Sequence, residues 1–164
     1  MHVGDERRGK RERRSGVAAS AAAGDGWPAL PGEGIYVLLL RVPEARGVEA
    51  GALGRLDLRP GFYAYVGRAR QGLTSRLARH ARREGKRLRW HVDHLILAAE
   101  VEEIWVLPLE AGECETAARL AGGGAGREGL RGFGASDCRC PGHLLYLGTR
   151  KPLPLRDAVR FAPP

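Results

Sequence analysis

The stretch GIYVLLLR, residues 34–41, sets the fold of this chain because it holds the longest strongly apolar run. It is rich in β-forming residues and too short for a stable helix, which predicts a buried strand. Residues 53–58, LGRLDL, alternate apolar and other side chains, as a half-buried strand does. The turn sequence RPG then leads into FYAYVG, residues 62–67, which predicts a third strand. Three consecutive strands with short connections predict an antiparallel meander.

Beyond residue 67 the spacing of apolar residues becomes helical. We expect helices over residues 74–84, 90–98 and 113–121, and strands over residues 101–108 and 144–147. Thr74 or Ser75 suits the N-cap of the first helix. Residues 91–97 also fit a strand, and we favour the helix. These elements predict an α+β domain, a small, mainly antiparallel three-stranded sheet flanked by helices on one face, with residues 53–58 as an extra strand.

The length of 164 residues suits one domain with extensions. We expect a disordered basic and alanine-rich leader at residues 1–31, the domain at residues 32–150, and a loose C-terminal tail at residues 151–164. The longest strongly apolar run is far shorter than the ~20 residues of a membrane-spanning helix, so no membrane partner is expected. Three cysteines in a chain of this size do not make a secreted disulfide framework, which favours the cytoplasm.

The positive charge of the chain is concentrated in one segment. The formal net charge is +8, and residues 68–89 contain nine basic residues with Glu84 as their single acid. Such a patch attracts a polyanion, and we expect nucleic acid. The alternative is a solvated arginine-rich helix face. The candidate nucleic-acid contacts are Arg68, Arg79, Arg82, Arg83, Lys86 and Arg87.

Two tyrosines and the arginine-rich helix form a candidate catalytic group. Tyr36 and Tyr65 each lie within two residues of a glycine, and adjacent strands would bring their phenols together. A phenol whose pKa is lowered by nearby cations acts as a general base, or its hydroxyl positions a water. Arg76 and His80 share one helical face, where a guanidinium suits a phosphate. The alternative is that these tyrosines only pack in the sheet.

Glu113 is the candidate ligand for a hard divalent cation. On a helical wheel it lies at the flank of the inward face, whereas Glu115 points away and pairs with Arg119. A carboxylate at the edge of a core can hold such a cation against phosphate oxygens.

The ordered set of these residues resembles the GIY-YIG nuclease superfamily. The signature tripeptides are Gly34-Ile35-Tyr36 and Tyr65-Val66-Gly67, and a helix-borne Arg76 follows them. The chain is most similar to one branch, an uncharacterised domain found alone or fused to the base-excision repair enzyme endonuclease III. The further matches over residues 33–148 are GFYAYVGRA (61–69), RLARH (76–80), WHVDHL (90–95), Glu113-Cys114 and FGASDCRCPGHL (133–144).

The resemblance implies a three-stranded antiparallel sheet flanked by helices and the hydrolysis of phosphodiesters. It implies that Tyr36 helps to activate a water, that Arg76 engages the scissile phosphate and that Glu113 binds one Mg²⁺ or Mn²⁺ ion, with Tyr65 as the second tyrosine. Two features depart from the superfamily. The tyrosines are 29 positions apart, and Glu113 opens its helix instead of lying deeper in it, so Asp93 and His91 are the reserve ligands.

A second metal site is an alternative for the cysteines. Cys138, Cys140 and His143 form a Cys-x-Cys-x-x-His sequence that Cys114 could complete as a zinc site. The spacing is not that of a standard zinc finger. Packed thiols and a histidine in a glycine-rich turn are the interpretation that the sequence favours.

Together these observations predict a magnesium-dependent endonuclease that cuts phosphodiester bonds in DNA at a particular structure or lesion. One alternative is a non-catalytic nucleic-acid-binding module that docks onto DNA repair enzymes. The other is an RNA-processing nuclease, which differs only in its substrate.

Overall fold

The computed structural model describes residues 26–85, 87–122 and 130–164. Within them, a five-stranded sheet has the order β6-β4-β1-β5-β7, and every pair of neighbours is antiparallel. Its strands are β1 (Gly34–Val42), β4 (Gly61–Ala69), β5 (Glu100–Leu107), β6 (Leu144–Gly148) and β7 (Val159–Phe161). The predicted class, mixed and mainly antiparallel, is confirmed, but the sheet is larger than the predicted three strands.

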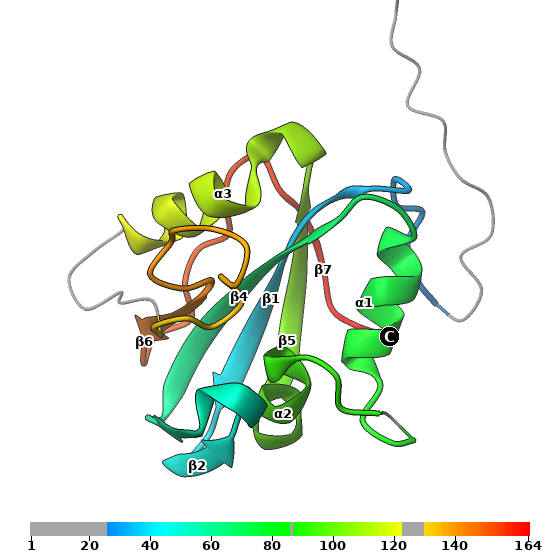
Figure 1. The fold of residues 1–164 in the computed structure, drawn as a ribbon. Helices are drawn as coiled ribbons and strands as arrows, with labels where there is room; N and C mark the ends of the chain where they lie inside the picture. Colours follow the sequence, from blue (N-terminus) through cyan, green and yellow to red (C-terminus); the bar gives the residue numbers. More distant parts are fainter. Residues whose placement is uncertain (1–25, 86, 123–129) are drawn as a thin grey trace, which may run out of the picture.

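Helices cover both faces of this sheet (Figure 1). Helices α1 (Leu73–Ala81) and α2 (His91–Ala98) lie on one face, and α3 (Glu113–Ala121) lies on the other. The prediction that the helices share one face is wrong. Strand β1 explains why, since eight of its nine residues are buried and successive side chains of a strand point to opposite faces. An apolar run without alternation needs a cover on each side.

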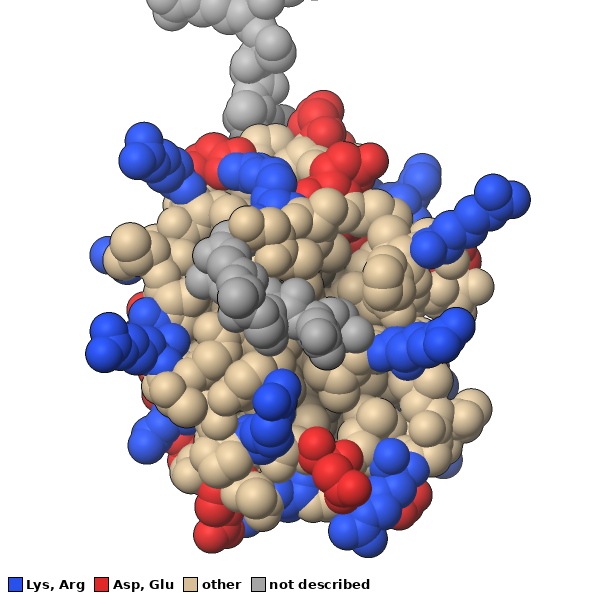
Figure 2. Space-filling view, turned by 90° about the vertical axis from the view of Figure 1, so that its left-hand side faces the viewer, with Lys and Arg blue, Asp and Glu red and all other residues tan. Residues whose placement is uncertain are grey.

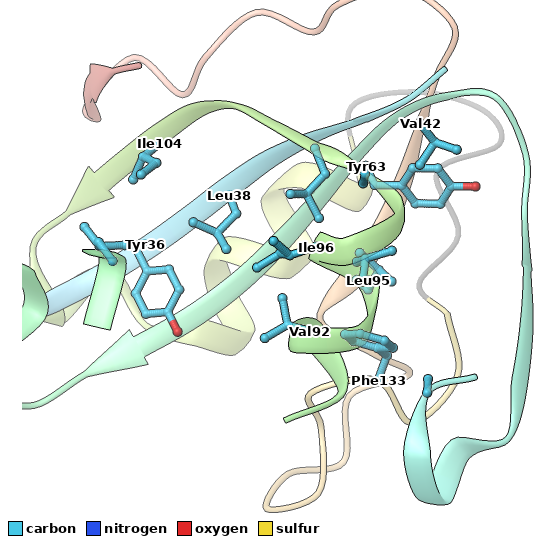
Figure 3. Packing of buried hydrophobic residues seen from close by; sticks show 14 of the residues in the cluster. Tyr36, Leu38, Val42, Tyr63, Val92, Leu95, Ile96, Ile104 and Phe133 are labelled. Carbon is cyan, nitrogen blue, oxygen red and sulfur yellow. The ribbon is translucent and has the colours of Figure 1, made fainter. Parts of the chain in front are cut away.

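The larger core lies between β1 and the helices α1 and α2. Figure 3 shows Val92, Leu95 and Ile96 of α2 beside Leu38 of β1. These side chains are at most 1% exposed, and α2 confirms the helix that we favoured for this segment. Helix α1 differs from its prediction in its ends: it begins after Gly72 without a side-chain cap, and it ends at Ala81.

The segment between the two tripeptides forms a separate two-stranded sheet. Strands β2 (Arg46–Glu49) and β3 (Arg55–Leu58) pair with each other around a short 3₁₀ turn, η1 (Gly51–Leu53). Strand β1 pairs directly with β4, so the predicted three-stranded meander is wrong. The alternation in residues 53–58 indicates a half-exposed strand, but it does not specify which strand is its partner.

The C-terminal tail is part of the fold and is not the predicted loose segment. Strand β7 pairs with β5, and the ring of Trp27 meets Phe161 edge-on, with centroids 6.0 Å apart. Leu30, in the predicted leader, is 6% exposed in the core. The remainder of that leader, residues 1–25, lies outside the described residues. Another 3₁₀ turn, η2 (Leu109–Ala111), links β5 to α3.

No helix within the described residues has the length and apolar character that crossing a bilayer requires.

Candidate active site

A pocket of about 730 Å³ lies where β1, β4, α1 and α3 meet the segment 130–143. Its charged lining comprises three arginines and two carboxylates, a mixture suited to a phosphate and a cation. The lining residues are Tyr36, Tyr65, Gly67, Arg68, Arg70, Gln71, Arg76, Trp90, Glu113, Ser136 and Asp137. The structure therefore brings together the two predicted tyrosines, the helix arginine and the predicted metal ligand.

The pairing of β1 with β4 places the two tripeptides side by side. Tyr36 is the cross-strand partner of Gly67, and a Cβ atom built on Gly67 would overlap the phenol ring of Tyr36. The glycine of the second tripeptide is thus the surface on which this ring lies. At Gly34 a Cβ atom would come within 2.8 Å of the carbonyl oxygen of Leu107. Both positions therefore require glycine, because neighbouring atoms lie where a Cβ atom would be.

The hydroxyl group of Tyr36 forms a hydrogen bond with buried His80. The Tyr36 Oη atom lies 3.0 Å from His80 Nε2, and His80 is 1% exposed. The Tyr65 ring lies 6.4 Å from that of Tyr36, centroid to centroid. His80, predicted to be catalytic, contacts Tyr36 and is not among the residues that line the pocket. It therefore orients the phenol.

Burial keeps both phenols protonated. It raises the pKa of Tyr36 to about 12, although the adjacent Arg76 guanidinium acts in the opposite direction. The pKa of Tyr65 is also raised by burial. The expectation that nearby cations lower the pKa of a tyrosine is wrong here, because desolvation outweighs the charge of Arg76. At neutral pH each phenol is a neutral hydrogen-bonding group.

Arg76 projects into the pocket beside Trp90. Its guanidinium carbon lies 5.1 Å from the centroid of the Trp90 ring, and Trp90 is 40% exposed. Trp90 is not among the site residues predicted from the sequence. An exposed aromatic residue within an arginine-rich segment was the available signal, since such rings stack on nucleic-acid bases.

Two other arginines of the basic segment have structural contacts. Arg79 forms a bidentate pair with fully buried Asp93, with N–O distances of 2.9 and 2.7 Å. The Asp93 Oδ2 atom also accepts the backbone N–H groups of Arg89 and Trp90 at the start of α2. Arg83 donates to the carbonyl oxygen of Ala99 at 2.7 Å.

These contacts change the predicted roles of the residues involved. Asp93 is engaged through both oxygens and does not serve as a reserve metal ligand. Arg79 compensates that buried carboxylate, and its predicted contact with nucleic acid stays a prediction. His91, the other reserve ligand, lies beside the ring of Phe133 in an adjoining pocket of about 220 Å³. Arg82 and Arg87 are exposed, and Lys86 lies outside the described residues.

Glu113 faces two neighbours from the start of α3. Its Oε1 atom lies 3.2 Å from His143 Nδ1, which raises the pKa of that histidine, and its Oε2 atom lies 3.7 Å from Arg68 Nε. Arg68 Nη2 in turn lies 3.5 Å from Asp137 Oδ2. Asp137, which the sequence-based analysis missed as a site residue, is therefore a second carboxylate at the same edge of the pocket.

The four residues of the alternative zinc site also meet. One ligand atom from each of Cys114, Cys138, Cys140 and His143 lies within 4.8 Å of the other three. His143 Nε2 lies 3.7 Å from the Cys114 Sγ atom and 3.5 Å from the Cys138 Sγ atom. The structure thus brings together the four residues of the alternative zinc site.

Charged side chains of both signs lie mostly around the rim of the face that carries α3 and β6 (Figure 2). The exposed arginines Arg82 and Arg87 belong instead to the segment after α1.

Comparison with known proteins identifies a family but no characterised relative. The sequence profile of the family described as Domain of unknown function DUF123 matches residues 35–160. Neither the curated proteins nor the solved structures gave a significant match. The match supports the part of the prediction that named an uncharacterised domain, and the wider nuclease superfamily stays a prediction.

Proposed function

Because the chain belongs to the DUF123 family, whose function is unknown, we propose its function from the pocket: it is a divalent-metal-dependent endonuclease that hydrolyses phosphodiester bonds in DNA. The observation that carries the proposal is the convergence of Tyr36, Arg76 and Glu113 on one pocket from β1, α1 and α3. The resemblance of both tripeptides to those of GIY-YIG nucleases supports it.

Arg76 is the residue that receives the scissile phosphate. Its guanidinium lines an open, polar pocket, and its planar fork suits two phosphate oxygens. Negative charge on those oxygens increases as the attacking water adds, so a fixed cation there stabilises the transition state. Arg68 and Arg70 add positive charge to the same wall.

Tyr36 positions the water. In the tautomer in which His80 Nε2 accepts, the Tyr36 hydroxyl donates to it and turns its oxygen lone pairs towards the pocket. As the water oxygen bonds to phosphorus, its proton passes to Tyr36 Oη, and the tyrosine proton passes to His80 Nε2. The bond from phosphorus to the leaving oxygen breaks, and that oxygen takes up a proton from solvent, while His80 later returns one to solvent.

The carboxylates at the pocket edge fit a Mg²⁺ or Mn²⁺ ion. Such ions are usually held by one or two carboxylates together with substrate phosphates, and Glu113 and Asp137 both line this edge. The Oε2 atom of Glu113 is the oxygen turned away from His143, and it would hold the ion. When bound, the ion would supply positive charge to the phosphate oxygens.

The substrate is a DNA with unpaired or distorted bases. Trp90 lines the pocket with a half-exposed ring on which such a base would stack, and Arg82 and Arg87 lie exposed nearby in the chain. A continuous duplex keeps its bases stacked and would not use this ring. This feature favours a lesion or a branched structure, in keeping with a role in repair.

The proposal is tested by incubating the purified protein with branched, nicked and single-stranded DNA and RNA, with and without Mg²⁺ or Mn²⁺. We expect metal-dependent cleavage of a branched or single-stranded DNA. Tyr36→Phe and Glu113→Gln should each lower turnover by roughly 10²-fold or more and leave binding intact. Glu115→Gln is the matched control, since Glu115 is exposed on the same helix.

One contact favours a second candidate function, a nucleic-acid-binding module without turnover that docks onto repair enzymes. The guanidinium of Arg68 lies 3.7 Å from the proposed metal-binding oxygen of Glu113, where it compensates the carboxylate charge. High affinity for DNA with no cleavage in either metal would establish this candidate. Cleavage confined to RNA would assign the protein to RNA processing.

A further inference from the structure

We propose that Cys114, Cys138, Cys140 and His143 bind one structural Zn²⁺ ion, which joins the start of α3 to the segment 130–143. The four ligands come from two parts of the chain that the sequence separates by more than twenty residues. This site is distinct from the proposed Mg²⁺ position and does not depend on the nuclease function.

Two distances in the tetrad match those of tetrahedral zinc coordination. Zinc bonds of about 2.3 Å to sulfur and about 2.0 Å to nitrogen place Sγ and Nε2 atoms about 3.6 Å apart and two Sγ atoms about 3.8 Å apart. The His143 Nε2 atom lies 3.7 Å from Cys114 Sγ and 3.5 Å from Cys138 Sγ. All four ligand atoms lie within 4.8 Å of one another, so a single ion reaches all of them.

The donor types select the metal. Three thiolates and one imidazole in a tetrahedral arrangement are a closed structural zinc site, whereas Mg²⁺ and Ca²⁺ prefer oxygen ligands. The cysteines are partly buried and all three are free thiols. Each loses its thiol proton when it binds the ion.

The backbone holds the ligands in place. The segment 130–143 folds back on itself, since Leu130 N–H donates to Leu144 O, Gly132 N–H to Pro141 O, and His143 N–H to Phe133 O. The carbonyl oxygen of His143 accepts from Val66 of β4, which fixes this ligand to the main sheet. A site built on such a frame needs little rearrangement to receive an ion.

Glu113 provides the outer contact of the site. Its Oε1 atom lies 3.2 Å from Nδ1 of His143, the ring nitrogen opposite to the one that faces the thiols. Zinc-binding histidines commonly donate this second N–H to a carboxylate, which fixes the tautomer and the ring orientation. Glu113 also lines the main pocket, so the ion would position a residue of the proposed active site without touching the substrate.

The metal content of the protein tests the proposal directly. Protein grown with added zinc and purified with a thiol reductant should contain about one zinc per chain by elemental analysis. Cys138→Ser and Cys140→Ser should reduce that content by tenfold or more. Arg139→Gln is the matched control, because Arg139 is exposed between the two cysteines and is not a ligand. Replacement by Co²⁺ should give the absorption of tetrahedral thiolate coordination, and the serine variants should lose it.

Wild-type protein answers the question even if the serine variants fail to fold. A strong zinc chelator with a thiol reductant should lower the melting temperature by roughly 10 °C or more. Zn²⁺ should restore it, and Mg²⁺ should not. A reduced protein that binds no Zn²⁺ in equilibrium dialysis, or whose melting temperature ignores the chelator, would overturn the proposal. The same conclusion would follow if the cysteines were found as a disulfide that excludes zinc under reducing conditions.

Glu113→Gln separates this proposal from the nuclease proposal. The variant should still bind zinc, with affinity reduced by roughly 10- to 100-fold, since the amide oxygen still accepts from His143. If the variant bound zinc with the affinity of the wild type, Glu113 would have no role in the zinc site. Zinc binding is measured without nucleic acid, so an inactive protein that holds zinc refutes only the nuclease function.

Discussion

Helix α1 carries arginines on two sides, and the two sides use the same side chain for different purposes. On the pocket side, Arg76 extends into an open polar cavity beside Trp90. On the side that faces α2, Arg79 is bound to Asp93, and Arg83, which follows the end of the helix, donates to a backbone carbonyl group. A basic segment in the sequence is therefore not a uniform binding surface, because some of its cations compensate acceptors inside the fold.

The largest effect on stability is expected on the α2 side. Arg79→Ala leaves the fully buried carboxylate of Asp93 without its bidentate partner, and should lower the free energy of unfolding by about 3–5 kcal/mol. Chemical denaturation measures this loss. Exposed Arg82, replaced by alanine, is the control and should change stability by less than about 0.5 kcal/mol. If both variants were equally stable, Arg79 would not compensate the charge of Asp93 as described.

The opposite pattern is expected on the pocket side. Arg76→Ala should lower the rate of DNA cleavage by roughly 10²-fold or more, because positive charge is removed from the place that receives the phosphate. Its free energy of unfolding should stay within about 1 kcal/mol of the wild type. Single-turnover kinetics and denaturation on the same preparation check both parts. A stable variant that cuts at the wild-type rate would exclude Arg76 from the chemistry.

A substitution at Gly67 of β4, beside the Tyr36 ring, should have an intermediate effect on stability. Gly67→Ala places a Cβ atom where the Tyr36 ring lies, and the displaced ring should lower stability by about 1–3 kcal/mol. It should also reduce cleavage, because the Tyr36 hydroxyl leaves His80. Gly32→Ala is the control, since a Cβ atom there meets nothing within 4 Å. Equal stability of the two variants would show that the ring finds room elsewhere.

The smallest effect is expected from the ionisation of Tyr36 at high pH. Its pKa is about 12 in the folded protein, above the ordinary value of 10.0, because burial disfavours the phenolate. Between pH 10 and 12 the folded protein therefore keeps the Tyr36 proton that the unfolded chain loses. The contribution of the neutral phenol to the free energy of unfolding is complete below pH 10 and is lost between pH 10 and 12. The slope is at most about 1.4 kcal/mol per pH unit. Denaturation at pH 9–11 should show a steeper decline for the wild type than for Tyr36→Phe, and parallel curves would contradict the burial of this phenol.

The sequence predicts the elements of this fold better than their arrangement. The apolar run of β1 and the helical spacing of α3 were readable because each pattern reflects local burial. Which helices cover each face of β1, and that β7 joins β5, depends on contacts between distant residues. Strand β7 is only three residues long, and so short a stretch does not identify a strand from its sequence.

The sequence also predicts some features of the candidate site and not others. Both tripeptides and Arg76 could be placed together because each tripeptide lies on a predicted strand and Arg76 lies on the helix that directly follows the second one. The engagement of Arg79 by Asp93 was not predictable, since an ion-paired arginine and a solvated one are identical in sequence. The sequence does not favour a zinc site of Cys114 with residues 138–143, because the spacing of these residues matches no standard zinc finger. Only the fold brings Cys114 close to the other three.

The central position of β1 has a consequence for the folding of the chain. Both of its neighbours, β4 and β5, follow it in the sequence, as do the helices that cover its two faces. During synthesis the most apolar strand therefore emerges before any of its partners, and it stays uncovered until α3 has left the ribosome. Pairing between such distant segments is slow, and an unpaired apolar strand is prone to associate with other chains. Residues 34–42 are the segment through which a nascent chain would aggregate or engage a chaperone.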